Sequence, residues 1–115
     1  MENTKQLVNE TIETLKEYIP KLQNACNDIT EALQTNSHST ALQLIGQFSE
    51  GMDWVSEANI LLAKLNVEVN IEELTNINGF FKEINSALSI EDYVLVADLF
   101  QYEVKPSLDK VNEAL

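Results

Sequence analysis

The chain has 115 residues, 44% of them hydrophobic, and its 19 acidic residues against seven basic ones give a formal net charge of −12. All seven basic residues are lysines, and this charge argues against nucleic acid and against anionic membranes as partners. The length suits a single domain, residues 1–115, large enough to bury a core without disulfides or metals.

The first predicted helix, residues 4–34, carries an apolar seam along its whole length. Asn3 is its expected cap, with Gln6 completing a capping box. Pro20 removes one backbone donor and predicts a kink rather than a break, because the seam runs past it. The single cysteine, Cys26, lies in the seam, and we interpret it as a packing residue. The seam residues are spaced alternately by four and three: Val8, Ile12, Leu15, Ile19, Leu22, Cys26, Ile29 and Leu33.

A polar segment, residues 35–40, predicts a tight turn into a second helix over residues 40–65. That helix has two adjacent apolar stripes, which favours contact with more than one neighbour. Asn59 falls within the first stripe, where it either fixes the register or is partly exposed. Gly46 and Gly51 either let a neighbouring backbone approach or mark a local distortion. The stripes are Ile45, Phe48, Met52, Val55, Asn59 and Leu62, and Trp54, Ala58, Leu61 and Leu65.

The next segment, residues 66–70, alternates apolar and polar side chains but is too short to form a sheet, so we expect an extended connector. Asn70 and Glu73 predict a capping box for a third helix over residues 71–88. The apolar positions of this helix again step by three and four: Leu74, Ile77, Phe81, Ile84 and Leu88.

A fourth helix is expected from residue 90 to near the C-terminus, opened by Ser89 and Asp92 and bent at Pro106. Its later seam consists of Ala97, Val104, Leu108, Val111 and Leu115. The fold class predicted from these elements is all-α, an antiparallel up-down-up-down four-helix bundle with a long kinked first helix. At 1.5 Å per residue the first helix reaches roughly 45 Å and the third about 27 Å. The surplus end of the first two helices would therefore expose part of their seams unless the kinks fold it back or a second copy covers it.

The sequence offers no visible apparatus for catalysis, a metal or a cofactor. Its one histidine, His38, lies in a predicted turn and cannot supply the paired Glu-x-x-His motifs of a di-metal bundle or a nucleophile triad. We therefore expect a protein that is not an enzyme and has no cofactor. Because neither a secretory signal nor an apolar run of about 20 residues is present, we also expect a cytoplasmic location.

One acidic residue, Asp98, stands in an almost wholly apolar run over residues 93–102. A buried carboxylate needs a partner, and Tyr102 and Lys105 lie one and two turns further along the same predicted face. We interpret the three as a buried polar group that fixes the position of the fourth helix. A small-molecule-binding site around Asp98 and Tyr102 is the alternative.

The segment SIEDYVLVADLFQYEVKPSL, residues 89–108, resembles the C-terminal signature of an uncharacterised family of small acidic helical proteins of Gram-positive bacteria. The resemblance implies no activity, cofactor or catalytic residue. In size, acidity and helical character the chain is also similar to bacterial export chaperones and adaptors of the flagellar type. The matching positions are Asp92, Tyr93, Ala97, Asp98, Tyr102, Glu103 and Pro106.

These features favour a helical protein-interaction module, adaptor or export-chaperone-like, whose apolar groove accepts a partner helix. Large adaptable side chains are the candidate groove residues: Phe48, Met52, Trp54, Phe80 and Phe100. Ordinary core packing is the competing interpretation for each of them, and Phe80, next to the seam residue Phe81, should point partly outward. The alternative function is a self-assembling, homodimeric structural bundle in which a second copy covers the exposed helix ends.

Overall fold

The computed structural model describes residues 2–115, and the elements in this range are all helical. The all-α class is therefore confirmed. The fourth helix is continuous and has three segments, because a π-helical turn separates two α-helical segments. The elements are α1 (Glu2–Gln34), α2 (His38–Lys64), α3 (Ile71–Ser89), and the fourth helix made of α4 (Tyr93–Leu99), η1 (Phe100–Val104) and α5 (Lys105–Glu113).

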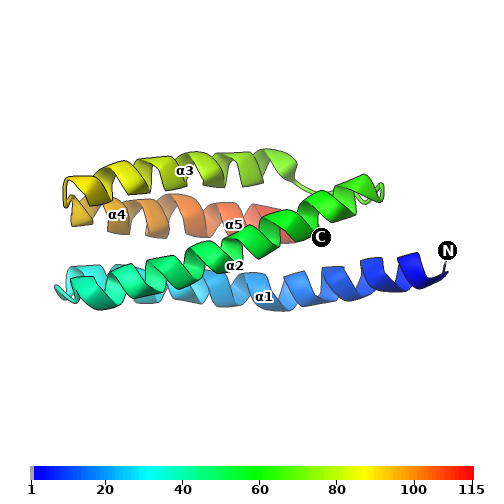
Figure 1. Ribbon diagram of the computed structural model, residues 1–115, viewed down its shortest axis with the longest axis horizontal. Coiled ribbons are helices and arrows are strands. Elements are labelled where there is room, and N and C mark those ends of the chain that lie inside the picture. Colours follow the sequence, from blue (N-terminus) through cyan, green and yellow to red (C-terminus); the bar gives the residue numbers. More distant parts are fainter. Residues whose placement is uncertain (1) are drawn as a thin grey trace.

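The helices form an elongated molecule of 51 × 21 × 19 Å (Figure 1). α1 packs against α2 and against the fourth helix, and α3 packs against the fourth helix. α2 runs obliquely from the far end of α1 toward the start of α3, and it has few contacts with α3 (Figure 1). The N-terminal part of α1 extends past the α2–α3 end of the molecule (Figure 1).

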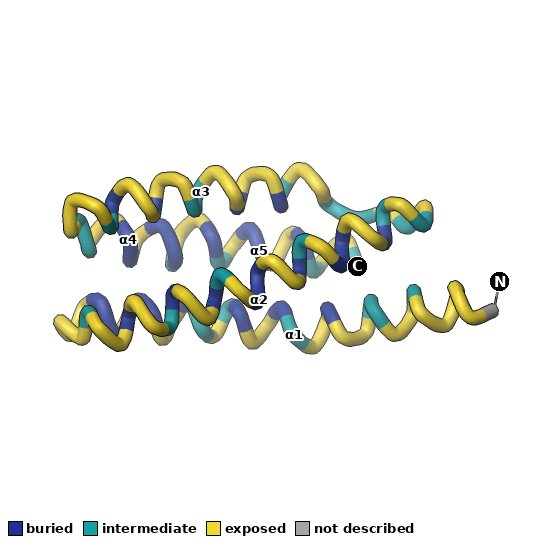
Figure 2. Tube along the Cα trace, in the orientation of Figure 1, coloured by how far each residue is buried: buried dark blue, intermediate teal, exposed yellow. Residues whose placement is uncertain are grey.

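The core is built from the predicted seams. In α1 the seam is buried from Leu15 to Leu33, whereas Val8 and Ile12 are only half-buried. Figure 2 shows the same change along α1, because its buried positions give way to exposed ones toward the N-terminus. The expected exposure at the surplus end of the first helix is confirmed.

Three phenylalanines join α2, α3 and the fourth helix at the centre of the core. The ring centroid of Phe48 lies 5.4 Å from that of Phe100 and 5.8 Å from that of Phe81. Phe81 and Phe100 are 6.1 Å apart and meet edge to face. These are the separations that aromatic pairs favour, so this cluster ties the oblique α2 to the other helices.

α1, α2 and α3 end in the same way. The residue two positions after each helix has a left-handed backbone, with φ of 60° at Asn36, 64° at Asn66 and 56° at Glu91. The following N–H then donates to a carbonyl five residues back, which satisfies an orphan acceptor of the helix end. These bonds run from Ser37 to Ala32 (2.8 Å), from Val67 to Leu62 (2.9 Å) and from Asp92 to Ala87 (2.9 Å).

The helix starts agree with the sequence only in part. α1 begins at Glu2, so Asn3 lies within the helix and its predicted role as a cap is wrong. Gln6 donates to the Glu10 carboxylate (3.0 Å) instead of completing a capping box. At the fourth helix, Ser89 is the last residue of α3, and Asp92 is the cap whose carboxylate accepts the Leu95 N–H (3.2 Å).

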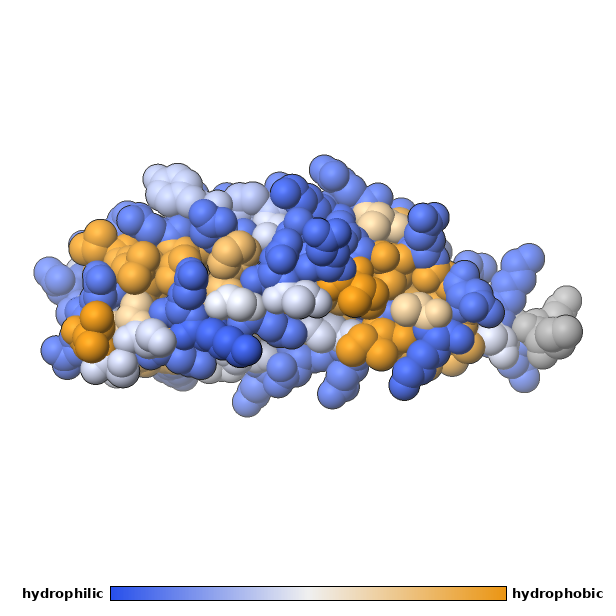
Figure 3. Space-filling model, turned by 90° about the horizontal axis from the view of Figure 1, so that it is seen from above, coloured by the Kyte–Doolittle hydropathy of each residue, from blue (hydrophilic) through white to orange (hydrophobic). Residues whose placement is uncertain are grey.

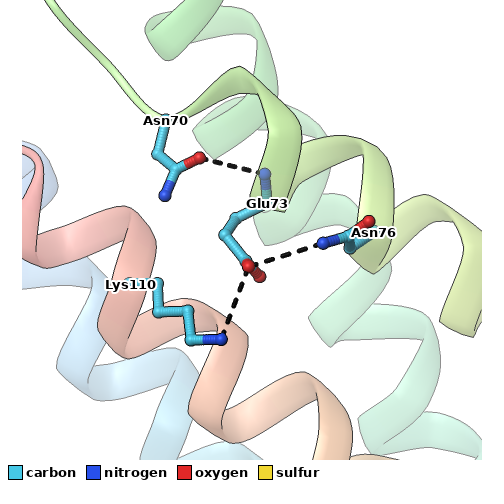
Figure 4. A network of polar contacts seen from close by, with 4 residues as sticks. All are labelled: Asn70, Glu73, Asn76 and Lys110. Atoms are coloured by element: carbon cyan, nitrogen blue, oxygen red, sulfur yellow. Dashed lines mark hydrogen bonds and ion pairs between the residues drawn. The ribbon is translucent and has the colours of Figure 1, made fainter.

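At the start of α3, one half of the predicted capping box is confirmed, because the Asn70 Oδ1 accepts the Glu73 N–H at 3.1 Å, whereas the Glu73 carboxylate has other partners. The Glu73 carboxylate accepts from Asn76 at 3.4 Å and lies 3.6 Å from the Lys110 Nζ (Figure 4). Glu73 therefore links the first turn of α3 to α5. Residues 67–70 before it are the expected connector without strand pairing.

The two prolines behave differently. α1 is one helix through Pro20, with the buried Ile19 and Leu22 on either side, and the kink stays a prediction. In the fourth helix the π turn η1 comes directly before Pro106, and the Lys105 N–H donates to the Phe100 carbonyl. A π turn contains one more residue than an α turn, so the residues after η1 are rotated relative to those before it.

The structure decides between the alternative interpretations of two residues of α2, Gly51 and Asn59. Gly51 is buried, and a Cβ there would collide with the hydroxyl of Tyr18, so it accommodates a side chain of α1 rather than a backbone. Asn59 is fully buried, which contradicts the partly exposed alternative. Its Nδ2 donates to the Val55 carbonyl (2.8 Å), and its Oδ1 has no partner among the described residues.

Candidate partner-binding surface

Three of the five expected groove residues belong to the core. Phe48, Met52 and Phe100 are buried among the four helices. Their assignment to an open groove is therefore wrong for this fold, because the bulk that would suit a guest helix already fills the space between this chain's own helices. Heptad spacing had placed Phe48 and Met52 in the first stripe of α2, which is its inner face. Phe48 and Phe100 meet there in the aromatic cluster.

The other two expected residues lie partly at the surface. Trp54 is 39% exposed and meets Tyr18 edge to face, with ring centroids 5.5 Å apart. Phe80 is half-buried and packs against the core from α3. They come from different helices, and neither lies among the most exposed apolar side chains of the molecule.

The predicted buried group of Asp98, Tyr102 and Lys105 is not formed. Asp98 is exposed, and Tyr102 is 70% exposed. Lys105 turns the other way, toward α1, where its Nζ donates to the Asn27 side chain (2.9 Å). Asp98 and Tyr102 both lie on the solvent side of the fourth helix. The π turn, residues 100–104, accounts for the different direction of Lys105, because its extra residue rotates Lys105 away from the face that regular α-helical spacing predicted.

The two most exposed of the large apolar side chains lie instead where α3 turns into α4. Ile90 is 73% exposed and Val94 is 75% exposed, and the neighbouring Leu95 is also exposed. We call these three residues the corner patch. Seen from above, apolar side chains are concentrated toward this end of the molecule and again toward the end where α2 leads into α3 (Figure 3). The sequence indicated an unusually apolar fourth helix but not which of its sides is left uncovered.

A cavity borders the corner patch on each side. On the α3 side, an open, shallow cavity of about 510 Å³ is lined by Lys82, Glu83, Ser86, Ala87, Ile90 and Leu95. On the α1 side, a cavity of about 520 Å³ lies between the α1–α2 turn and the start of α4. We call the second one the end cavity.

The end cavity is acidic. Its lining includes three carboxylates, those of Glu91, Asp92 and Asp98, of which Asp92 is already engaged as a helix cap. His38 also lines it and stacks on Tyr93, with ring centroids 4.0 Å apart. Among the described side chains no ion pair engages Glu91 or Asp98, so an apolar patch lies beside negative charge that no lysine neutralises.

The one thiol of the chain has no place at this surface. Cys26 is fully buried in the α1 seam, and burial raises the pKa of its thiol to about 12, against the lowering effect of the Lys105 charge. A neutral, buried thiol is a packing group. Within residues 2–115 no group of His, Cys, Asp and Glu side chains is suitably arranged to hold a metal ion, and no helix is both long and apolar enough to cross a membrane.

Comparison of the sequence with known protein families identifies the family of this chain. A family model described as a domain of unknown function, DUF8042, matches residues 10–114. The chain belongs to the DUF8042 family. No curated protein and no solved structure matches the chain. The match extends from the third turn of α1 to the end of the fourth helix, so the DUF8042 domain comprises all four helices except the first turns of α1, and it includes the corner patch.

Proposed function

We propose that this DUF8042 domain is a helical protein–protein interaction module, an adaptor or export-chaperone-like protein that is not an enzyme. The corner patch carries the proposal, because Ile90 and Val94, which leave 73% and 75% of their area uncovered, are the two most exposed of the large apolar side chains among the described residues. Contiguous exposed apolar surface bordered by polar groups is typical of partner-binding sites. The corner patch thus replaces the groove expected from the sequence.

An antiparallel up-down-up-down bundle, in which the α1–α2 hairpin supports α3 and the fourth helix, is the frame we propose for this surface. The aromatic cluster supports it, since Phe48, Phe81 and Phe100 come from three different helices and meet within 6.1 Å. A frame held in this way presents the corner patch in one fixed geometry. The kink of α1 at Pro20 remains part of the proposal.

A cytoplasmic protein of a Gram-positive bacterium is the setting we propose for the module. The likeness of residues 89–108 to small acidic proteins of such bacteria supports the origin, and the buried free thiol of Cys26 suits a reducing compartment. The net charge of −12 supports partners other than nucleic acid and anionic membranes.

The second candidate function is self-assembly into a structural homodimer. It is favoured by the opposite end of the molecule, where Val8 and Ile12 are half-buried and Leu61 is exposed. A second copy packed there would cover apolar surface that this chain leaves open. The corner patch is the more exposed of the two surfaces, and we therefore place the partner-binding function there.

The experiment is affinity capture from the native host with the tagged chain at low and high salt, followed by titration of the purified partner. The test variant is Val94→Glu, and the control is Gln43→Glu, which adds the same charge at an exposed site on α2. The proposal predicts one saturable partner that Val94→Glu loses and Gln43→Glu keeps. Recovery of only the untagged copy of the chain, together with a dimer in light scattering, would establish self-assembly instead.

A further inference from the structure

We propose that the corner patch and the end cavity together bind one amphipathic helix of a partner protein, whose apolar stripe is flanked by lysine or arginine. The inference rests on the proposed function and adds the chemistry of the partner. It follows from two surfaces of opposite character that meet at Val94, which belongs to the corner patch and also lines the end cavity.

The apolar half of the site has the shape that a helix stripe needs. Ile90 lies in the turn between α3 and α4 and Val94 in the first turn of α4, and both are exposed. The cavity beside Leu95 is lined in part by Ala87, a small residue. This open cavity of about 510 Å³, which Lys82, Glu83 and Ser86 also line, has room for a leucine- or methionine-sized side chain against its apolar residues. A helix lying across the corner would place one anchor there and the next, three or four residues on, against Val94.

The acidic half of the site sets the charge of the partner. The Glu91 and Asp98 carboxylates line the end cavity, and neither is paired with a lysine among the described side chains. A lysine or arginine beside the partner's apolar stripe would reach into this cavity when the stripe lies on Val94. Complementary charge of this kind selects the partner and speeds association.

The backbone at Glu91 provides a separate argument. Helices α1 and α2 place an asparagine at their left-handed stop, whereas α3 places Glu91 there, with φ of 56°. Asparagine adopts this left-handed conformation more easily than glutamate, because its short side chain can form local hydrogen bonds. The backbone conformation therefore costs more free energy at Glu91 than at the two asparagines. Strain of this kind persists where the side chain serves another purpose, and a carboxylate aimed at a basic partner is such a purpose.

The same charges disfavour a second copy of the chain as the occupant. A symmetric pairing through the corner would bring two sets of Glu91 and Asp98 together, in a chain whose net charge is already −12. Like charges at an interface suppress association. A basic helix from a different protein satisfies both halves of the site.

The test uses a synthetic 18-residue helical peptide with a leucine stripe flanked by lysines, titrated against the full chain by fluorescence anisotropy. Two matched peptides carry glutamates in place of the lysines, or serines in place of the leucines. We expect saturable 1:1 binding of the basic peptide that weakens with salt, and binding at least about tenfold weaker for both matched peptides. Equal binding of the glutamate peptide would overturn the inference.

Variants of the chain locate the site. Val94→Ser and the double change E91Q/D98N should each lower the affinity for the basic peptide by about tenfold. Glu57→Gln, which neutralises an exposed carboxylate of α2, should leave this affinity unchanged. Unchanged binding by both test variants, with intact thermal unfolding, would contradict the inference. A native partner lost by Val94→Glu but unaffected by E91Q/D98N would also contradict it while leaving the proposed function in place.

Discussion

At the scale of single residues, two glycines of α2 provide a matched pair. A Cβ at Gly51 would collide with the Tyr18 hydroxyl, whereas a Cβ at Gly46 would meet nothing within 4 Å. We expect Gly46→Ala to stabilise the chain by up to about 1 kcal/mol, because alanine is the better helix former. Gly51→Ala should destabilise it by about 1 kcal/mol, because overpacking outweighs that gain.

The measurement for this pair is urea denaturation of both variants and of the double variant Tyr18→Phe/Gly51→Ala. Removing the hydroxyl should return most of the stability lost by Gly51→Ala. If Gly51→Ala proved as stabilising as Gly46→Ala, then the close approach of Tyr18 to α2 would not exist in solution.

Cys26 predicts a pH dependence of stability. Its thiol pKa is about 12 in the folded chain against an ordinary value of 9.0, so the folded state holds its proton more tightly than the unfolded state. The stabilisation is complete below about pH 9 and is lost as the pH rises toward 12. At pH 10.5 the wild type should lose about 2 kcal/mol more of its free energy of unfolding than Cys26→Ala does. Parallel losses in the two proteins would show that the thiol is accessible to water.

At the scale of elements, the three helix stops predict which position gains from glycine. Glu91→Gly should stabilise the chain by about 1 kcal/mol, because glycine adopts the left-handed conformation without a steric penalty. Asn36→Gly is the control and should gain less, since asparagine already suits that backbone. Equal gains in chemical denaturation would mean that Glu91 carries no special strain.

The sequence predicts the elements and their inner faces well. The spacing of Leu15, Ile19 and Leu22 identifies the buried side of α1, because three- and four-residue steps return to one face of a helix. The same reasoning fails between Asp98 and Lys105, where the π turn changes the spacing. Heptad counting assumes a regular α-helix. The position of the extra residue of the π turn can be seen only in the three-dimensional packing before Pro106, not in the spacing of the sequence.

The candidate site could be predicted less well than the fold. An apolar residue on a helix can belong to the core or to the surface. The sequence does not distinguish the buried Phe48 from the exposed Val94, because their exposure depends on which helices pack around them. Phe48 is covered by two aromatic rings from other helices, and Val94 is left 75% exposed by the turn that precedes it. The corner patch therefore depends on where α3 stops, which is a property of the Glu91 backbone.

At the scale of the whole molecule, the aromatic cluster should be the main link between α2 and the other half of the assembly. Phe48→Ala removes the ring that contacts both Phe81 and Phe100, and we expect it to cost about 3–5 kcal/mol of unfolding free energy. Trp54→Ala is the comparison, because Trp54 contacts only the Tyr18 ring among the described aromatic side chains and is partly exposed. A smaller loss for Phe48→Ala than for Trp54→Ala in thermal unfolding would contradict this account of the core.

We propose the corner patch as the surface on which this DUF8042 domain receives its partner. The most direct test is NMR of the isotopically labelled chain, in which backbone amide shifts are followed as the lysine-flanked amphipathic peptide is added. We expect shifts that cluster at the α3–α4 turn and on the α1–α2 turn across the end cavity, around Val94 and His38. Shifts confined to the first turns of α1 and the last turns of α2 would contradict it and would move the binding site to the opposite end of the molecule.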